Sequence, residues 1–479
     1  MIAIVNGTVV TMDPERRILD DGVVLIEDQH VSAVAPASKV EVPRDAEVID
    51  ATGMVVLPGL INGHTHVPHS LLRGLAASQD RRVLDWLINV VHSGLAAYEL
   101  SDIRVAVRLY CVEAVRSGIT CLVDNFEGRP DQTLEAGKQV VDSYAEAGIR
   151  AMVARMMFDT KPDVMADRIR SLRAKEPDVV HADIWRSTEA LLSDTERLIR
   201  TFNGSADGRI QIWPAPAGTG MSSERVLRAS QRLARDNGTM WTLHLVQSLE
   251  PEHGTATSTR FLQDKGLLDE RLLASHCVNL DENDIELLRA ADVKGCTRVA
   301  SNSSMAMGVA PVPALVEAGV LVGIGTDDVN CNQSVNLLSD MKILAMVHRT
   351  FADNPSALTP EKILEMATID GASAVGMGTE IGSIETGKRA DVILIDFRHA
   401  QTTPAHHIPT ALVFQTYGNE VDTVIIDGNI VMRNHELTWM TPAEEQELYR
   451  DASERSTAIS MRAGISTNRP WTASSGQRA

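Results

Sequence analysis

The sequence predicts an α/β fold in which a (β/α)8 TIM-like barrel carries a small β-sandwich domain built from both chain ends. Three observations support this fold class. The chain has 479 residues, too many for one small core, since domains run to roughly 100–200 residues and α/β barrels to ~250 or more. Short apolar runs alternate with helical segments through the long middle of the chain, and the two flanks share a strand-rich texture that the middle lacks.

The middle of the chain contains eight candidate strands. They are VVLPGLI (55–61), GITCLVDN (118–125), RAMVARMM (150–157), RIQIWPAP (209–216), MWTLHLV (240–246), LLASHCV (272–278), KGCTRVA (294–300) and LVGIGTD (321–327). Between them lie periodic stretches such as SSERVLRASQRLARDNG, with a serine to start a helix and a glycine to stop it. This alternation predicts parallel strands with crossover helices, and eight repeats predict a closed barrel. An open doubly wound sheet is the alternative, although no G-x-G-x-x-G motif follows a strand.

The flanks consist of short alternating runs separated by turn residues. IAIVNGTVVTMD near the start and VDTVIIDGNIVM near the end are examples. We therefore assign residues 1–57 plus 381–440 to one composite β-sandwich domain and residues 58–380 to the barrel. Residues 441–479 form a C-terminal helix and tail, the helix over PAEEQELYRDASERSTAISMRAG.

The charge balance excludes several classes of partner. The formal net charge is −19, whereas nucleic acids and anionic membranes need a basic face. No apolar run approaches the ~20 residues of a membrane span. We expect neither a nucleic acid nor a membrane as partner.

The cysteines and the N-terminus indicate a cytoplasmic protein. The cysteines number five and none is arranged as C-x-x-C, which favours reduced thiols over disulfides or a cysteine zinc site. The first residues, MIAIVNGTVVTMD, lack the basic and long apolar segments of a signal peptide.

Polar residues that could bind a metal lie at the ends of four of the predicted strands. The first strand leads into NGHTH with His64 and His66, the fifth carries His244, the sixth His276, and the eighth ends in Asp327. In a barrel the carboxyl ends of the strands form the active-site face. Two histidines that are two residues apart on a strand point to the same side. We therefore expect these side chains to lie together at one opening of the barrel.

Imidazoles with one carboxylate suit Zn²⁺ or Fe²⁺. Such an ion lowers the pKa of a bound water toward ~7 and makes hydroxide at neutral pH. Related barrels with two metals bridge them through a modified lysine on the fourth strand, but no lysine lies between Lys175 and Lys265. We expect one divalent metal ion per subunit.

Longer motifs resemble the amidohydrolase superfamily over nearly the whole chain. They include PGLINGHTHVPHSLLRG, WTLHLVQS, ASHCVNLDENDIELL, GVAPVPALVEAGVLVGIGTDD and ILEMATIDGASAVGMGTEIGSIETGKRADVILID. The similarity is strongest to the branch of aminohydrolases and chlorohydrolases acting on triazines, pyrimidines and purines, and within it to atrazine chlorohydrolase and melamine deaminase. The resemblance implies a small N-heterocyclic substrate and a homo-oligomer.

The resemblance also implies roles for the strand-end residues. His64, His66, His244 and Asp327 would hold the metal. His276 would orient or deprotonate the attacking water, or serve as a fifth ligand. Asp327 would receive the proton of that water.

Two further positions bear on the leaving group. In TDDVNC this chain carries Asp328 and Cys331, as the melamine-deaminase side of the resemblance does, whereas the chlorohydrolase side carries Asn and Ser. This favours cleavage of a C–N bond over a C–Cl bond.

One position departs from the family pattern. The family usually has H-x-x-E after the fifth strand, but here HLVQ places Gln247 where the glutamate passes protons. An amide cannot act as a general acid or base near neutral pH. An amine leaves poorly without a proton, whereas chloride needs none, so Gln247 conflicts with the indication from Asp328 and Cys331.

Three interpretations stay open. Another acid, with Asp328, Glu250 and Glu252 nearest, replaces the glutamate; or the leaving group is a halide; or the chain binds metal and ligand with little turnover. Hydrolysis of a cyclic amide would use the same site. The leading hypothesis is a hydrolytic deaminase, with His69 and Trp86 after the first strand as further substrate-binding candidates.

Overall fold

The computed structural model describes residues 1–75, 81–128, 132–181, 183–246 and 258–467. Its centre consists of eight parallel strands in two four-stranded sheets. The strands of the first sheet are β6 (Leu60–Thr65), β7 (Ile119–Phe126), β8 (Arg150–Met157) and β9 (Ile210–Pro216), and those of the second are β10 (Trp241–Leu245), β11 (Leu272–His276), β12 (Lys294–Thr297) and β13 (Val322–Ile324). Each of the eight predicted strand ranges overlaps one of these strands, so the α/β class is confirmed.

The two parallel sheets meet at both of their edges. β9 lies next to β10, and the segment after β13 is joined to β6 by the backbone N–H of Asp327, which donates to the carbonyl of His64 at 3.0 Å. Thr65 and Asp327 also form an isolated parallel bridge. Within the described residues the regular ladders form two sheets, so one continuously closed barrel stays a prediction.

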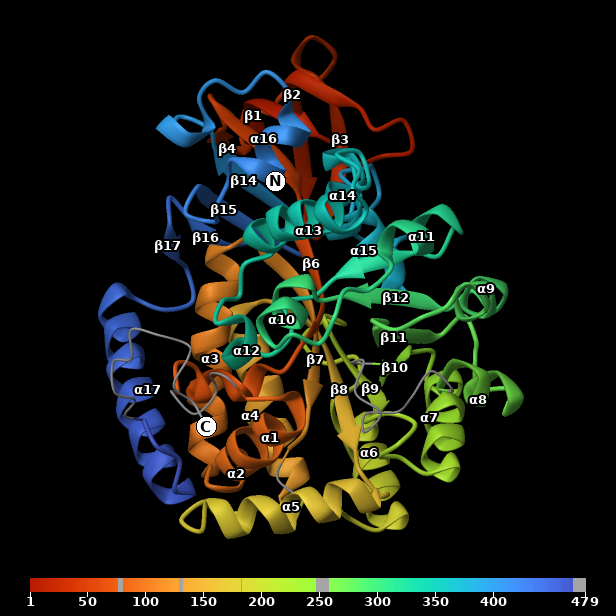
Figure 1. Ribbon diagram of the computed structural model, residues 1–479. Helices are drawn as coiled ribbons and strands as arrows, with labels where there is room; N and C mark the ends of the chain where they lie inside the picture. Colours follow the sequence, from red (N-terminus) through yellow and green to blue (C-terminus); the bar gives the residue numbers. More distant parts are fainter. Residues whose placement is uncertain (76–80, 129–131, 182, 247–257, 468–479) are drawn as a thin grey trace.

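A third, mixed sheet of nine strands contains both ends of the chain. Its strands are β1 (Ile2–Val10), β2 (Ile18–Glu27), β3 (His30–Pro36), β4 (Glu47–Asp50), β5 (Met54–Pro58), β14 (Val392–Asp396), β15 (Val421–Ile426), β16 (Asn429–Arg433) and β17 (Glu436–Leu437). β5 pairs parallel with β1 and antiparallel with β14. The red N-terminal strands and the blue C-terminal strands therefore lie side by side (Figure 1). Hydrogen bonds connect all nine strands into one sheet rather than two, and the sandwich and its domain boundaries stay predictions.

The first predicted strand, residues 55–61, is two strands in the structure. β5 belongs to the mixed sheet and β6 to the first parallel sheet, and Gly59 lies between them. A Cβ at Gly59 would lie only 2.0 Å from Oγ1 of Thr120. The missing side chain thus lets the chain pass tightly from one sheet to the other, a feature that the continuous apolar pattern conceals.

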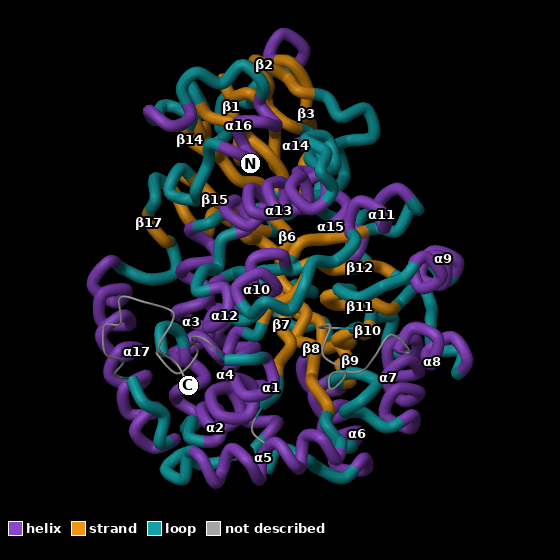
Figure 2. The backbone as a smooth tube through the Cα atoms, in the orientation of Figure 1, coloured by secondary structure: helices purple, strands orange, loops and turns teal. Residues whose placement is uncertain are grey.

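Helices cover the parallel strands (Figure 2). Their bounds are α1 Val83–Trp86, α2 Ser93–Ala96, α3 Leu100–Arg116, α4 Thr133–Ala147, α5 Asp163–Lys175, α6 Thr188–Phe202, α7 Glu224–Asp236, α8 Ser258–Asp264, α9 Glu282–Ala290, α10 Val299–Ser304, α11 Val312–Glu317, α12 Val329–Asn332, α13 Leu337–Phe351, α14 Pro360–Ala367, α15 Ile369–Ala374, α16 Ile408–Phe414 and α17 Pro442–Ala463, with short helices η2 at Val67–Leu72 and η4 at Leu87–His92. With helices outside and side chains between the sheets, β7 and β8 are buried at every position, as is typical of parallel sheets.

The helix ends follow the expected capping chemistry. Ser223 accepts a hydrogen bond from the backbone N–H of Val226 at the start of α7. At the start of α17, Thr441 and Glu444 form a capping box, and Gly464 ends the helix with a φ of +67°. Helix α7 was predicted from its starting serine, and α17 from the stretch PAEEQELYRDASERSTAISMRAG. The caps follow the rule that side-chain oxygens satisfy free N–H groups and that glycine tolerates the left-handed region.

Among the described helices, none is both long and apolar enough to cross a bilayer. All five cysteines are buried and unpaired, as expected for reduced thiols.

Candidate metal centre and active-site pocket

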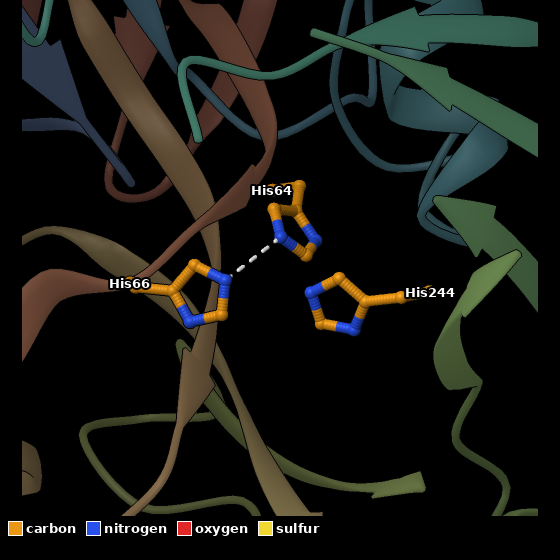
Figure 3. A group of neighbouring side chains, drawn as sticks. All are labelled: His64, His66 and His244. Atoms are coloured by element: carbon orange, nitrogen blue, oxygen red, sulfur yellow. Dashed lines mark hydrogen bonds between the residues drawn. The ribbon is translucent and has the colours of Figure 1, made fainter. Parts of the chain in front are cut away.

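Four histidines and one aspartate from the ends of four strands lie together, as predicted. His64 lies in β6 and His66 just beyond it, His244 lies in β10, and His276 ends β11. Asp327 follows β13 by three residues. We call these five residues the histidine cluster. Figure 3 shows the rings of His64, His66 and His244 pointing toward one another.

The distances within the histidine cluster are those of groups around one small centre. Nε2 of His64 lies 3.2 Å from Nε2 of His66. Oδ1 of Asp327 lies 3.5 Å from the first of these nitrogens and 3.7 Å from the second. One ligand atom each from His64, His66 and His244 lies within 4.8 Å of the others, and the rings of His244 and His276 are 5.3 Å apart.

Hydrogen bonds fix the orientation of three of these rings. Nδ1 of His66 lies 3.0 Å from the carbonyl oxygen of Asn125, which can only accept, so Nδ1 carries the proton. Nδ1 of His276 likewise faces Oδ1 of Asn302 at 3.1 Å. A backbone hydrogen bond to Ala217 holds His244. A ring that donates from one nitrogen presents a lone pair on the other, and Nε2 of His276 is buried with no hydrogen-bond partner.

The fourth ring, His64, lies against an asparagine amide. Nδ2 of Asn125 lies 2.8 Å from Nδ1 of His64, while Oδ1 of the same amide is buried without a partner. Rotation of the amide by 180° would let Oδ1 accept the Nδ1 proton and leave Nε2 with a free lone pair. Oxygen partners of this kind orient the histidine ligands of metal sites.

Burial keeps the four imidazoles neutral. It lowers the pKa of His66 to about 4, with the neighbouring His69 adding to the effect. Burial, followed by the charge of Arg298, holds the pKa of His64, His244 and His276 well below its ordinary value. All four rings are therefore unprotonated near pH 7, the state in which imidazole binds metals.

Asp327 is held as a carboxylate. Burial works to raise the pKa of Asp327, but Arg298 and the nearby histidines hold it well below the ordinary range. Nη1 of Arg298 lies 3.5 Å from Oδ1 of Asp327, and Oγ of Ser301 donates to Oδ2 at 2.6 Å. Arg298 is fully buried and none of its side-chain nitrogens makes a hydrogen bond. The pattern of the sequence did not identify it, because the predicted strand 294–300 places Arg298 inside a strand, whereas β12 ends at Thr297.

The backbone at these strand ends adopts uncommon conformations. Val246 has a φ of +46°, His276 of +73°, Cys277 of +54° and Asp327 of +62°. Positive φ is unfavourable for residues with a Cβ, above all for β-branched valine. Such strain gathers at functional sites, and here it turns the chain at the ends of three of the parallel strands.

A partly open pocket lies beside the histidine cluster, and His66, His244 and Asp327 form part of its wall. His69, Trp86, Asp328 and Cys331, the predicted substrate-binding residues, all line it. Most of the remaining wall is apolar, with Phe158 and the methionines Met156, Met221, Met305 and Met307. The pocket can thus hold a flat, weakly polar ring between sulfur and aromatic side chains.

His69 and Asp328 form a buried ion pair in the pocket wall. Nδ1 of His69 is hydrogen-bonded to Oδ2 of Asp328, and its ring stacks on that of His66 with centroids 5.1 Å apart. Burial opposes protonation of His69, but the charge and hydrogen bond of Asp328 raise its pKa to about 9. Asp328 thereby has a partner inside the protein, and His69 is a cation.

Trp86 is fixed by a hydrogen bond from its Nε1 to Oδ1 of Asn330 at 2.5 Å. Cys331 is buried, and burial raises the pKa of its thiol well above the ordinary value. It therefore meets a ligand as a neutral thiol.

One pocket residue that sequence reasoning missed is Glu127, which directly follows β7. Its position beyond a predicted strand was a usable signal. Glu127 can also group with His66 and His69 within 4.8 Å. The choice of catalytic acid depends on Gln247, Glu250 and Glu252. These three residues lie outside the described residues.

Comparison with known proteins identifies the family. A model of the amidohydrolase family matches residues 55–431. The chain belongs to the amidohydrolase family. The match spans every residue of this amidohydrolase's histidine cluster.

Three similar proteins illustrate the range of relatives of this amidohydrolase. An S-triazine hydrolase of Gordonia rubripertincta is 41% identical over 479 residues, which cover 98% of each chain. A 5'-deoxyadenosine deaminase of Methanosarcina acetivorans is 32% identical and covers 95% of this chain and 98% of its own. The crystal structure of an adenosine deaminase from Xanthomonas campestris with bound zinc is 26% identical, with a TM-score of 0.83 over 95% of this chain and 98% of its own.

Proposed function

We propose that this protein is a metal-dependent hydrolase that uses water to displace an amino group from a nitrogen heterocycle such as an s-triazine, pyrimidine or purine. The observation that carries the proposal is the histidine cluster, in which neutral imidazoles and one carboxylate face a common centre beside an apolar pocket. The names of the relatives, an S-triazine hydrolase and a deoxyadenosine deaminase, support this choice of substrate.

The residues present fit a single divalent cation, Zn²⁺ or Fe²⁺. His276 has a buried Nε2 with no partner, and Nε2 of His66 lies beside Asp327 with its proton on the other nitrogen. Unsatisfied buried acceptors are costly, and a cation would satisfy them together. We assign His64, His66, His244 and Asp327 as its ligands, and His276 either serves as a fifth ligand or keeps its Nε2 for the attacking water. When bound, such an ion acts as a Lewis acid that makes water a better nucleophile.

Each of the side chains then has its own role in hydrolysis. His276 orients the attacking water, or deprotonates it, through its free Nε2. Asp327 accepts the water proton on its carboxylate, in which Oδ1 faces His64 and His66 and Oδ2 accepts from Ser301. Trp86 and the methionines hold the ring, and His69 and Asp328 flank it. Addition of the water oxygen to the ring carbon breaks the aromatic system, and its recovery expels the leaving group.

Release of ammonia or an amine requires a proton, and Gln247 cannot supply one. Asp328 and Cys331 line the pocket and favour the amine by resemblance, so we retain the deaminase as the first choice. A halide hydrolase is the second candidate, favoured by Gln247 alone. A Gln247→Glu variant separates them: release of amine should rise by about 10-fold or more if an acid is limiting, and release of chloride should not.

The proposal is tested with the purified holoenzyme. Metal content is measured by elemental analysis, and release of ammonia and chloride is followed over matched amino- and chloro-substituted triazines, pyrimidines and purines. We expect about one metal ion per subunit and ammonia release from at least one ring class. Fully metal-loaded protein that releases neither product would contradict the proposal and leave a ligand-binding protein, whereas a ring-opened product would identify a cyclic-amide hydrolase.

The composite domain from both chain ends supports the barrel in this proposal. It supplies no residue to the pocket among the described side chains. The homo-oligomer stays a prediction, tested by the mass of the protein in solution.

A further inference from the structure

Glu127 is a carboxylate in the pocket wall to which none of the described residues donates a hydrogen bond. Its side chain is only 9% exposed. The nearest basic atoms are Nε2 of His69 at 3.8 Å and Nε2 of His92 at 4.0 Å, both beyond hydrogen-bonding distance. No other described residue donates to it. Among the described residues, this largely buried carboxylate therefore has no hydrogen-bonding partner.

The other two carboxylates near the pocket are already engaged. Asp328 accepts from His69 on one oxygen and from the backbone N–H of Asn330 on the other, at 2.8 Å. Oδ2 of Asp327 accepts from Ser301. Since a buried polar group without a partner is costly, Glu127 is the carboxylate whose environment a ligand would complete.

Glu127 lies where a bound ring would meet it. It lines the same pocket as Trp86, Met156 and Phe158, and its oxygens lie close to ring nitrogens of His66 and His69. Burial raises the pKa of Glu127, while the cation on His69 acts against that rise. A ligand that donates an N–H would satisfy the acceptor without bringing a second anion next to Asp328.

We propose that Glu127 is a specificity-determining residue that accepts a hydrogen bond from an N–H substituent of the substrate ring other than the group that leaves. This inference rests on the proposed function, because it takes the ring-binding pocket as given. It narrows the substrate class to heterocycles that carry a second amino or monoalkylamino group. It also disfavours rings with a carboxylate or phosphate on that edge, which Glu127 would repel.

The test uses two ring probes with the same leaving group. One carries a monoalkylamino substituent and the other a dialkylamino substituent, which is similar in size and electronics but has no N–H. The wild-type holoenzyme should favour the first probe by about 10- to 100-fold in KM, the value of a hydrogen bond to a charged group. In Glu127→Met, which removes the acceptor, the difference in KM between the two probes should disappear.

Glu127→Gln is the matched control, because it keeps the shape and one acceptor oxygen but loses the charge. It should retain a reduced preference for the N–H probe. Equal discrimination by the wild type and Glu127→Met would overturn the proposal. A fall in kcat with unchanged KM would also overturn it, since Glu127 would then act as a proton donor.

Binding measurements separate this inference from the proposed function. The dissociation constants of both probes are measured by calorimetry on wild type and Glu127→Met. If no probe is hydrolysed but the wild type binds the N–H probe more tightly and the variant does not, the hydrolase proposal fails and the role of Glu127 stands. If neither probe binds, both are wrong.

Discussion

Two buried groups of titratable side chains lie at opposite ends of the parallel strands and differ in how their carboxylates are paired. At the amino end, Arg150 begins β8 and donates from Nε and Nη2 to the two oxygens of Asp391, both at 3.1 Å. Arg389 donates to Asp427 at 2.6 Å, and the backbone of Asp427 donates to Asp391 at 2.8 Å. We call these four residues the arginine cluster.

The histidine cluster lies at the carboxyl end and contains polar atoms without hydrogen-bonding partners. Nε2 of His276 has no partner, and Oδ1 of Asp327 has only contacts of 3.5 Å or more. The arginine cluster joins the mixed sheet to the parallel strands, and its carboxylates face arginines, although Nη1 of Arg150 and Oδ2 of Asp427 are buried without a hydrogen bond. Unsatisfied atoms therefore occur in both clusters, and burial of charge alone does not mark a site. The histidine cluster is distinguished by its neutral imidazoles around one carboxylate and by its place at the carboxyl end, where barrels perform chemistry.

The largest expected effect follows from removing a charge of the histidine cluster. Asp327→Asn should lower kcat/KM by at least about 1,000-fold and reduce bound metal, because one residue serves as ligand and proton acceptor. Steady-state rates and elemental analysis measure this. Asp391→Asn is the matched control in the arginine cluster, with activity per folded molecule expected to be normal. Full metal occupancy and normal rates in Asp327→Asn would refute the assignment.

The arginine cluster should respond in the opposite way. Arg150→Met leaves Asp391 without its two donors and should lower the free energy of unfolding by about 3 kcal/mol, as for other broken buried ion pairs. Urea denaturation measures the loss, and the activity of the folded fraction should be unchanged. Arg225→Met removes an exposed pair with Glu189 and should change stability by no more than about 0.5 kcal/mol. Similar losses in the two variants would contradict the structural role of the arginine cluster.

Arg298 provides a sharper test, because it belongs to the histidine cluster by contact but has no hydrogen bonds. Arg298→Met leaves Asp327 as a buried anion and should destabilise the metal-free protein by about 1–3 kcal/mol. A bound cation would compensate that charge, so the metal-loaded protein should lose less. Thermal melts of both forms measure the difference. An equal loss in both would show that Arg298 acts only by packing.

The smallest expected effect is a pH dependence of the arginine cluster. Burial acts to raise the pKa of Asp427, but Arg389 and Arg150 lower it below its ordinary value. In the unfolded chain an aspartate titrates near pH ~3.9. The stability from this carboxylate is therefore present above that pH and lost as the pH falls through the folded pKa. The melting temperatures of wild type and Asp427→Asn should converge in acid, and a difference that persists unchanged to pH ~3 would exclude this origin.

The sequence predicted what depends on local pattern. The eight strands were found because short apolar runs alternate with capped helices, and the histidine cluster was found because His64 and His66 lie two apart at one strand end. Their convergence required only the rule that parallel strands share a carboxyl edge.

The rest depends on pairing and contacts that no single segment encodes. The split of residues 55–61 at Gly59 follows from the approach of Thr120, which comes from a distant strand. The single mixed sheet arises because β5 pairs with both β1 and β14. Glu127 directly follows a predicted strand, so its position could be read from the sequence. Its lack of a hydrogen-bonding partner among the described residues could not, because it depends on His69 being hydrogen-bonded to Asp328.

The position of Gly59 has a consequence for engineering. The strand that precedes it is flanked by β1 and β14, and the strand that follows it carries His64. Deleting residues from the amino end to obtain a minimal catalyst would therefore remove strands that support β6. This strand positions the ring of His64. A circularly permuted protein with new termini in a surface loop, and with both original ends fused, would preserve that anchorage.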